Sequence, residues 1–599
     1  MTAPLVPDSY VDAFRRRRSV TPESRAAVLA AMDLEPGEDP PGADAVAIAP
    51  PGAPLLSAGT LVLEDGTDLG RVSAVPADAP YGYHFLVRDD GTEQQLITGP
   101  GRCWLPTDLR AWGWVVQLAV TRSGGSWGVG DLVDLSELAR LSVGLGAGFL
   151  AVGPLTAPNP GPDPDPSPYY PSTRRFGSPL HVAIDVIPGA DAVAELAVRG
   201  RALNAERLVD RPRVLALKME ALARLWSLET FDRRAFEEWR TVRGPSLERW
   251  AEFCALAERL GADWRRWPSS PPPAPPERVA FHAWVQWCFD LQLADASLRI
   301  RRVADMPVGV DPAGFDAWDW QEQLTRGASL GVPPDRFNAE GQDWGFPAFV
   351  PHWLRQAGYR PFVETVRAQL RHAGGLRIDH VLGLFRLWWV PAGADPTEGA
   401  YVTQPTAELL EIVALESHRA GAIVIGEDLG TVPAGVRPEL RRRRLLSTRL
   451  VLFERVPPRR YPRQAFGGVT THDLPTMAGL WSGADVRDQA AAGVNPDVSA
   501  SERLRGRLAR MAGVGADAPL EDAVIALHRR LAASPAMLVG ATLEDALGIE
   551  TRPNVPGTVP PARPNWSLAL PTPIEGFGSR QGIVRLAEAL RRTPAGEEP

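Results

Sequence analysis

Eight short apolar segments, each typical of a buried strand, recur between Trp112 and the C-terminus with helical or irregular stretches between them. They read GWVVQLAV, GFLAVGPL, RRVADMPVGV, GLRIDHVLGL, AIVIGEDLG, STRLVLFE, GVTTHDLP and AMLVGATLED. Parallel strands need long crossover connections, usually helices, so this alternation predicts a parallel sheet. Eight such units are enough to close the sheet on itself. We therefore expect an α/β fold whose main body is a (β/α)8 TIM barrel over residues 111–599.

The remaining sequence predicts additions to this barrel. Residues 1–48 contain TPESRAAVLAAM, in which a threonine N-cap precedes a proline and an alanine-rich body, and this indicates a helical segment. Residues 49–110 hold β-like runs that end in Asp-Gly, a hairpin signal, and predict a β-sandwich domain. Within the barrel, residues at about 180–280 are rich in Arg, Glu, Leu and Trp and predict an inserted helical subdomain.

Charge and cysteine content argue against several classes of protein. The net charge of −8 is small for 599 residues and gives no indication of binding to nucleic acid or to a membrane surface. No stretch approaches the ~18 consecutive apolar residues of a membrane span. The three cysteines are too few and too widely spaced for a disulfide framework or a zinc site. We therefore expect a cytoplasmic protein that needs neither a metal nor another cofactor.

Carboxylates follow three of the eight predicted strands. The fourth strand ends in RIDH, the fifth in GED and the seventh in HD. Because the active site of a (β/α)8 barrel lies at the C-terminal ends of its strands, we expect Asp379, Glu427 and Asp473 at one rim. An acid at a strand end can also simply cap the next helix, so no one of the three indicates catalysis by itself.

The RIDH segment places charge in an otherwise apolar run. Side chains alternate along a strand, so Arg377 and Asp379 point to the same side and can pair. A guanidinium favours the ionised form of a neighbouring carboxyl, which is the form that a nucleophile needs. A purely structural ion pair explains the same pattern equally well. Two carboxyl groups in different environments, here Asp379 and Glu427, would suit retaining glycosyl transfer.

Aromatic side chains accompany the predicted loops. Tyr169 lies in the proline-rich loop from Asn159 to Ser172, Trp344 in GQDWGFP and Trp127 in GGSWGVGD. Flat aromatic side chains stack on the apolar faces of sugars, so these residues are compatible with a sugar ligand. Ordinary core packing is the alternative for each of them.

Several motifs, taken together and in order, resemble those of a known family. LRIDH, IGEDLG and THDLPT, with SWGVGDLVDL, SPYYPSTRRFGSPL, ADMPVGVD, GVPPDRFNAEGQDWGFP and RPNVPGTVPPARPNW, are similar to blocks of the 4-α-glucanotransferases. These enzymes are also called amylomaltases or disproportionating enzymes and form glycoside hydrolase family 77. The resemblance covers residues 112–566, and APYGYHFL resembles the extra N-terminal domains of the longer bacterial members.

This resemblance implies an activity and a set of site residues. The expected enzyme is a retaining transglycosylase that cleaves an α-1,4-glucan, forms a covalent glucosyl-enzyme and transfers the glucan segment to the 4-hydroxyl of an acceptor glucan or glucose. Its substrates are maltooligosaccharides and α-1,4-glucans. Asp379 matches the nucleophile, Glu427 the general acid/base and Asp473 the third carboxylate. The implied substrate contacts are Arg377, His380, His472, Trp344, Gln342, Asp335, Tyr169, Ser167, Asp305, Asn554 and Asp131.

Two departures and two alternatives accompany this interpretation. Ser178-Pro179 stands where many relatives have Asn-Pro, and relatives often carry a tyrosine near Ala119, so acceptor length or affinity can differ. A hydrolase of α-1,4-glucans would use the same three acids. A catalytically silent glucan-binding protein, in which the N-terminal β domain acts and the barrel is a scaffold, is the other alternative.

Overall fold

The computed structural model describes residues 4–335, 340–515 and 517–592. The chain divides into two compact units. Unit 1 contains residues 1–105, 306–312 and 316–447, and unit 2 contains residues 106–305, 313–315 and 448–599. Both units contribute strands to the predicted barrel, and each is described by itself below.

The predicted (β/α)8 barrel is confirmed. Its eight strands close in the order β10-β13-β16-β17-β18-β19-β8-β9. In chain order the strands are β8 (Ala111–Val116), β9 (Phe149–Val152), β10 (Arg301–Met306), β13 (Gly375–Ile378), β16 (Ile423–Gly426), β17 (Leu446–Leu450), β18 (Ala465–Gly468) and β19 (Leu538–Thr542). The strands are buried nearly throughout, which explains why they appear in the sequence as continuous apolar runs.

The backbones of adjacent strands approach closely where glycine allows it. Gly113 of β8 pairs with Phe149 of β9 in parallel register. A Cβ atom at Gly113 would lie 2.1 Å from the Phe149 carbonyl oxygen, so only glycine fits this position.

The predicted position of the seventh strand is wrong. We expected it within GVTTHDLP, but β18 ends at Gly468, before the histidine and the aspartate. The Thr470 Oγ hydroxyl donates to the Pro475 carbonyl oxygen (2.8 Å), and the Leu474 N–H donates to the Thr471 carbonyl oxygen (3.2 Å). These local bonds make the segment a turn, so His472 and Asp473 lie in the loop after the strand.

The N-terminal part of unit 1 mixes strands with one helix. α1 (Pro22–Ala30) begins at the predicted N-cap, where the Thr21 side chain accepts from the Ser24 N–H. Residues 1–48 are not only helical, however, because they also contain β1 (Ser9–Val11), β2 (Arg17–Ser19) and β3 (Val46–Ile48).

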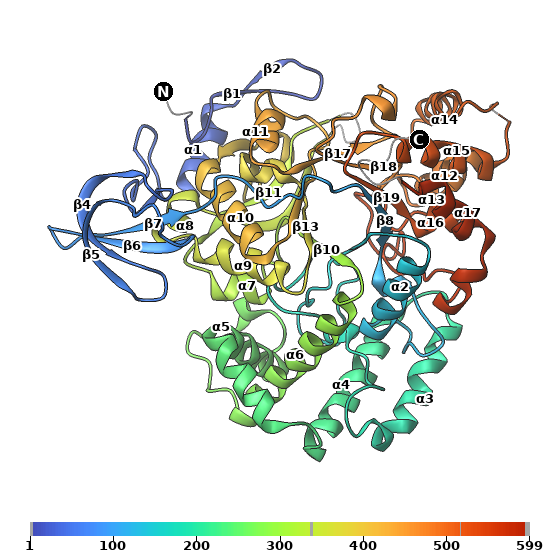
Figure 1. The fold of residues 1–599 in the computed structure, drawn as a ribbon, viewed down its shortest axis with the longest axis horizontal. Coiled ribbons are helices and arrows are strands. Elements are labelled where there is room, and N and C mark those ends of the chain that lie inside the picture. The colour runs from blue at the N-terminus through green and yellow to red at the C-terminus, as the bar shows by residue number, and fades with distance from the viewer. Residues whose placement is uncertain (1–3, 336–339, 516, 593–599) are drawn as a thin grey trace. The chain divides into compact units, whose positions relative to one another are not determined.

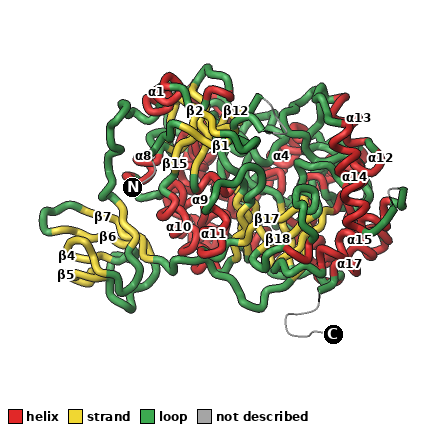
Figure 2. Tube along the Cα trace, turned by 90° about the horizontal axis from the view of Figure 1, so that it is seen from above, coloured by secondary structure: helices red, strands yellow, loops and turns green. Residues whose placement is uncertain are grey.

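The expected β-sandwich is a single sheet. Its strands β3, β4 (Pro54–Val62), β5 (Asp68–Ala74), β6 (Gly82–Arg88) and β7 (Glu93–Thr98) pair in the order β3-β7-β6-β4-β5, and Figure 2 shows β4 to β7 side by side. Its buried cluster includes Leu61, Leu86 and Leu96. Helices of unit 1 replace a second sheet: the Tyr83 hydroxyl of β6 donates to the Glu416 Oε1 atom of α10 (Thr406–Ala420) over 2.9 Å.

Unit 1 also contains an antiparallel sheet that the sequence did not predict. Its strands β11 (Leu324–Val332), β12 (Gln342–Phe349), β14 (Arg386–Pro391) and β15 (Ala400–Thr403) pair in the order β12-β11-β14-β15. The apolar run that follows the fourth barrel strand belongs to this sheet rather than to the barrel, because the short helix η6 (Val381–Leu384) separates β13 from β14.

The predicted helical insertion is confirmed in unit 2. It consists of the short helix η2 (Pro179–His181), α3 (Ala194–Ala202), α4 (Arg211–Leu228), α5 (Arg233–Leu260) and α6 (Pro276–Ser297), coloured in greens in Figure 1. α5 is kinked, because Gly244 has a φ of 66° and Pro245 follows it. The barrel helix α2 (Leu132–Gly144) packs against α6.

The other helices connect or cover the strands. They are α7 (Phe315–Asp319), α8 (Pro351–Gln356), α9 (Arg360–Leu370), α11 (Val436–Arg442), α12 (Met477–Ser482), α13 (Ala484–Ala491), α14 (Val498–Ala512), α15 (Leu520–Ala532), α16 (Leu543–Leu547) and α17 (Gln581–Leu590). None of the helices in the described ranges has the length and apolar character that crossing a lipid bilayer requires.

Candidate active site

In unit 1, two acids follow neighbouring barrel strands. β13 pairs in parallel with β16, and Ile378 is the register partner of Gly426. Asp379 and Glu427 directly follow these two residues, so the strand pairing itself brings the two carboxyl groups to adjacent strand ends. The Asp379 N–H donates to the Met306 carbonyl oxygen (3.1 Å), and the Glu427 N–H donates to the Ile378 carbonyl oxygen (3.0 Å), which fixes both backbones.

The ion pair expected between Arg377 and Asp379 is present. The Arg377 Nη2 atom donates to the Asp379 Oδ1 atom over 2.7 Å. Both side chains are partly exposed, at 19% and 23%, so the pair faces solvent rather than a sealed core. The guanidinium therefore holds one oxygen of Asp379 and balances its negative charge, while the carboxyl stays reachable for a ligand.

Glu427 occupies a different environment from Asp379. Burial and, to a smaller extent, the negative charge of Asp379 raise the pKa of the Glu427 carboxyl to about 7, against the opposing effect of Arg377. Its two oxygens accept from backbone donors, Oε2 from the His380 N–H (3.0 Å) and Oε1 from the Leu429 N–H (2.8 Å). A carboxyl with such a pKa can give and take a proton near neutral pH.

Three further predicted residues of unit 1 form a chain of contacts that begins at His380, the residue after Asp379. His380 adopts a left-handed backbone conformation (φ 45°), and its ring centroid lies 5.5 Å from that of Trp344 in an edge-on arrangement. Burial lowers the pKa of His380 to about 4, with the charge of Arg386 as a smaller cause, so its ring is neutral. The Trp344 Nε1 atom donates to the Gln342 Oε1 atom (2.9 Å).

Asp335 is a further predicted contact of unit 1. It is half-buried and lies directly before residues 336–339, which are outside the described ranges. Its charge is a minor cause of the raised pKa of Tyr401, which burial mainly produces. Asp335 therefore lies close to the β14–β15 hairpin, which carries Tyr401.

In unit 2, a second group of predicted residues surrounds Asp473. The Asn554 Nδ2 atom donates to Asp473 Oδ1 (2.7 Å), and His472 Nε2 lies 3.3 Å from Asp473 Oδ2. The Asn554 N–H donates to the His472 carbonyl oxygen (3.1 Å), and Arg552 Nη1 donates to the Asp473 carbonyl oxygen (2.9 Å). The THD loop is thus tied to the RPN segment, and the Asp473 side chain is held while 43% of it stays exposed.

Tyr169 links the proline-rich loop to this group. Its hydroxyl donates to Asp305 Oδ2 (2.7 Å), and its ring centroid lies 4.8 Å from that of His472. The Ser167 Oγ atom accepts from the Tyr169 N–H (3.3 Å), which helps to fix the loop. The predicted residues Ser167, Tyr169, Asp305 and His472 are therefore brought together.

Two residues of this group were not predicted from the sequence. The Gln117 Nε2 atom lies 3.5 Å from His472 Nδ1. The Trp566 ring lies 5.1 Å from the ring of His472 and 5.3 Å from that of Tyr169, so it completes an aromatic cluster. Signals were available for both: Gln117 is the polar residue in an apolar strand segment, and Trp566 ends the quoted RPNVPGTVPPARPNW motif.

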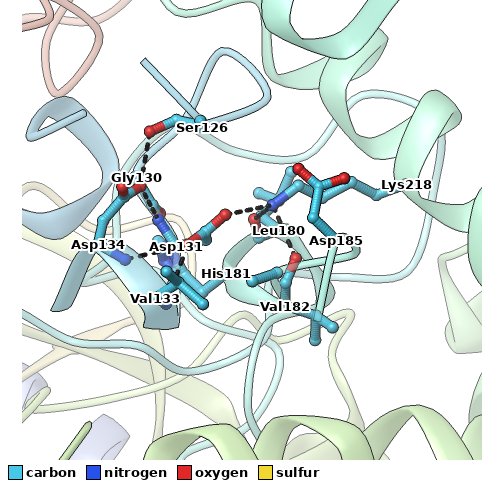
Figure 3. Close-up of polar contacts among 12 residues, drawn as sticks. Ser126, Gly130, Asp131, Val133, Asp134, Leu180, His181, Val182, Asp185 and Lys218 are labelled. Atoms are coloured by element: carbon cyan, nitrogen blue, oxygen red, sulfur yellow. Dashed lines mark hydrogen bonds and ion pairs between the residues drawn. The ribbon is translucent and has the colours of Figure 1, made fainter. Parts of the chain in front are cut away.

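Two residues quoted from the SWGVGD motif have structural roles. Asp131, a predicted substrate contact, is only 5% exposed and caps α2, accepting from the backbone N–H groups of Val133 (3.0 Å) and Asp134 (3.2 Å) (Figure 3). Lys218 lies 3.9 Å from its other oxygen. Trp127 is 1% exposed and packs on Gly200, where a Cβ atom would lie 2.4 Å from its ring. Both side chains thus have structural contacts, and the role of Asp131 as a substrate contact stays a prediction.

Comparisons with known proteins identify the family of the chain. The sequence model of a family described as 4-alpha-glucanotransferase matches residues 116–573. The chain therefore belongs to the 4-alpha-glucanotransferases, which form glycoside hydrolase family 77. A 4-alpha-glucanotransferase of Mycobacterium tuberculosis is 40% identical, with 88% of this chain and 82% of the relative covered. One of Haemophilus influenzae is 31% identical, with 84% and 82% covered.

Solved structures extend the likeness to the N-terminal part. The crystal structure of an amylomaltase from Corynebacterium glutamicum is 30% identical, has a TM-score of 0.87 and covers 98% of both chains. An amylomaltase from Streptococcus agalactiae, 18% identical with a TM-score of 0.65, shares the fold over 80% of this chain. As a family member, the chain is an enzyme that transfers glucan segments by a retaining mechanism.

Proposed function

We propose that Asp379 is the nucleophile, Glu427 the general acid/base and Asp473 the third carboxylate of a transferase that acts on maltooligosaccharides and longer α-1,4-glucans. The contrast between the first two acids carries this proposal. Asp379 pairs with Arg377, whereas burial and the charge of Asp379 raise the pKa of Glu427 to about 7. Two carboxyl groups whose environments separate their pKa values are the arrangement that a double displacement uses.

In the first step, an Asp379 oxygen attacks C1 of the glucosyl ring that precedes the cleaved linkage. The C1–O4 bond breaks, and its electron pair goes to the departing O4 atom. Glu427 donates its proton to that oxygen, so the leaving glucan departs as a neutral alcohol. The products are a covalent β-glucosyl ester on Asp379 and an ionised Glu427.

In the second step, the roles of Glu427 reverse. The ionised Glu427 takes the proton of an acceptor's 4-hydroxyl, whose oxygen attacks C1 and forms the new α-1,4 bond. The ester bond to Asp379 breaks, and the nucleophile is restored. Two inversions give net retention at C1, and Glu427 ends protonated as it began.

The other site residues orient the sugar in this proposal. Asp473 accepts hydroxyl hydrogens of the ring at the cleavage point, and Asn554 and His472 hold its carboxylate for that role. Tyr169 supplies a flat surface for a ring, and Asp305 fixes the Tyr169 hydroxyl. The remaining proposed contacts are Arg377, His380, Trp344, Gln342, Asp335 and Ser167.

Transfer instead of hydrolysis requires that an acceptor hydroxyl reaches the intermediate before water does. The loop from Asn159 to Ser172 supports this preference, because Tyr169 from this loop packs on His472 and Trp566 and can cover a bound sugar. Incubation with maltotriose tests the proposal. Disproportionation gives glucose together with longer maltooligosaccharides. Accumulation of glucose and maltose without longer products would identify a hydrolase, and no conversion would support the silent glucan-binding alternative.

A cytoplasmic location belongs to the same proposal. Cys103, Cys254 and Cys288 are all buried and free of disulfide bonds, which is compatible with a reducing compartment. Fractionation of the source cells, with activity on maltotriose as the marker, tests this location.

A further inference from the structure

A pocket in unit 2 adjoins the aromatic cluster of Tyr169, His472 and Trp566. Gln117, Ser167 and Trp566 line this pocket, and each of them also contacts His472 or Tyr169. Much of the remaining lining is apolar and comes from the proline-rich loop, the short helix η1 (Leu118–Val120) after the first barrel strand and the segment that follows Trp566. The pocket thus continues the proposed sugar site within one unit.

One buried carboxyl group lines this pocket without a hydrogen bond from another of the described residues. Glu544 lies in the first turn of α16, directly beyond the C-terminal end of β19, and is only 7% exposed. Within the described parts of the chain, its own backbone N–H is the donor close to the carboxyl, no other residue donates a hydrogen bond to it, and the charge of His472 is a smaller effect that lowers its pKa. A buried polar group in this state lowers stability unless a ligand satisfies it.

The charges around the pocket restrict the kind of ligand. Burial raises the pKa of Glu544 to about 7, with the charge of Asp545 as a smaller cause, so near neutrality the carboxyl can both accept and donate a hydrogen bond. The lining also contains three arginines and a second acid, but each has a partner. Arg207 donates to the Ala569 carbonyl oxygen, Arg211 to Ser567 and Arg552 to the Asp473 carbonyl oxygen. Asp165 accepts from the Ser167 N–H. A neutral ligand rich in hydroxyl groups and with an apolar face therefore fits better than a cation or an anion.

We propose that this pocket is a glucosyl-binding subsite and that Glu544 is a substrate-binding residue in it, which contacts the ring hydroxyls while Trp566 and the proline-rich loop cover the apolar face. The proposal rests on the proposed function, since it assigns one more ring of the same glucan. It also explains why the chain keeps, in a buried position, an acid that receives no hydrogen bond from another of the described residues.

Two buried cations of α4 fix the walls of this subsite. The Lys218 Nζ atom donates to the carbonyl oxygens of Leu180 (2.7 Å) and Val182 (2.8 Å), on the short helix η2 and just after it, as Figure 3 shows. Arg211, at the start of the same helix, donates to Ser567 Oγ (2.8 Å) and to the Trp566 carbonyl oxygen. Leu180, Trp566 and Ser567 line the pocket, so the helical insertion sets its shape before a ligand binds.

Calorimetric titration with maltopentaose tests the subsite without turnover. The parent protein carries Asp379→Asn, which prevents cleavage, and the comparison adds Glu544→Ala, Glu544→Gln or the matched control Glu550→Ala. Glu550 is exposed and lies on the same segment. Loss of a hydrogen bond to a sugar hydroxyl weakens binding by about tenfold, so we expect this for Glu544→Ala. Glu544→Gln keeps an acceptor and a donor and should bind within about threefold of the parent.

The outcomes separate this proposal from the function on which it rests. Parent-like affinity in the Glu544→Ala variant would overturn the subsite but leave the three-carboxylate mechanism untouched. Absence of maltopentaose binding by the parent itself would contradict both. Equal weakening by Glu550→Ala would also overturn the subsite, because it would show a general effect of losing an acid in this segment. Thermal unfolding of each variant verifies that the fold persists.

Discussion

The Glu427→Gln variant tests whether the acids of the site have different catalytic roles. The glutamine keeps an oxygen that can accept from the Leu429 or the His380 N–H, but it has no proton to give to a leaving oxygen. General acid catalysis contributes about 10²- to 10⁴-fold, or about 3 to 5 kcal/mol of barrier. We expect kcat/KM for maltotriose to fall by that factor while the fold persists.

The pKa of Glu427 sets the expected pH dependence. Because burial and the charge of Asp379 raise this pKa to about 7, the protonated acid predominates below pH 7 and is lost as the pH rises through it. The wild-type enzyme should therefore lose kcat/KM for maltotriose on the alkaline side of about pH 7. The residual activity of Glu427→Gln should lack this limb, since no titrating acid remains at the position.

A donor whose leaving group needs no proton tests whether the Glu427→Gln variant is slow because it lacks a proton donor. α-Maltosyl fluoride releases fluoride, which needs no protonation, so the first step should be nearly normal in the Glu427→Gln variant when fluoride release is followed in its first turnover. Glu550→Gln makes the same chemical change at an exposed position and should behave like the wild type with both donors. Equal losses with maltotriose and with the fluoride, or wild-type rates with maltotriose, would refute the assignment of Glu427 as the acid.

Three further changes test other parts of the account. Asp379→Asn should abolish transfer from both donors in an assay of product formation while the melting temperature stays close to that of the wild type, and turnover above about 1% of wild type would contradict this. Asn554→Ala frees one Asp473 oxygen, so kcat/KM for maltotriose should fall about tenfold, and an unchanged value would exclude this orienting role. Lys218→Met leaves Asp131 and two carbonyl oxygens buried without their cation, and urea unfolding should show a loss of about 3 to 5 kcal/mol. A loss under about 1 kcal/mol would show that the contacts of Lys218 are not tightly coupled to folding.

The barrel could be predicted because its strands are buried on both faces. Such strands appear as short continuous apolar runs, and helical connections between them permit only parallel pairing. The position of the acids was predicted from the rule that the C-terminal ends of barrel strands share one rim. The structure adds the register, in which Ile378 is the partner of Gly426, so that Asp379 and Glu427 follow adjacent strands. The ion pair between Arg377 and Asp379 could be predicted because side chains alternate along a strand, which puts both on the same side.

The features that the sequence did not reveal depend on tertiary contacts. A single β-sheet covered by helices shows the same alternation of residues as one half of a sandwich, so the covering helix α10 could not be inferred. Asp131 carries the type of side chain that binds sugars, but its capping bonds and Lys218 occupy it. Glu544 follows a predicted strand as the catalytic acids do, yet only the pocket around it indicates a ligand.

The covalent intermediate tests the central claim most directly. Glu427→Gln should accumulate a maltosyl ester when it is mixed with α-maltosyl fluoride, because the fluoride bypasses the first proton transfer and the second step lacks its base. Mass spectrometry of the intact protein, followed by peptide mapping, would then show one added maltosyl group on the peptide that contains Asp379. Attachment to a different residue, or rapid turnover of the fluoride without an adduct and with inversion at C1, would contradict the retaining mechanism through Asp379.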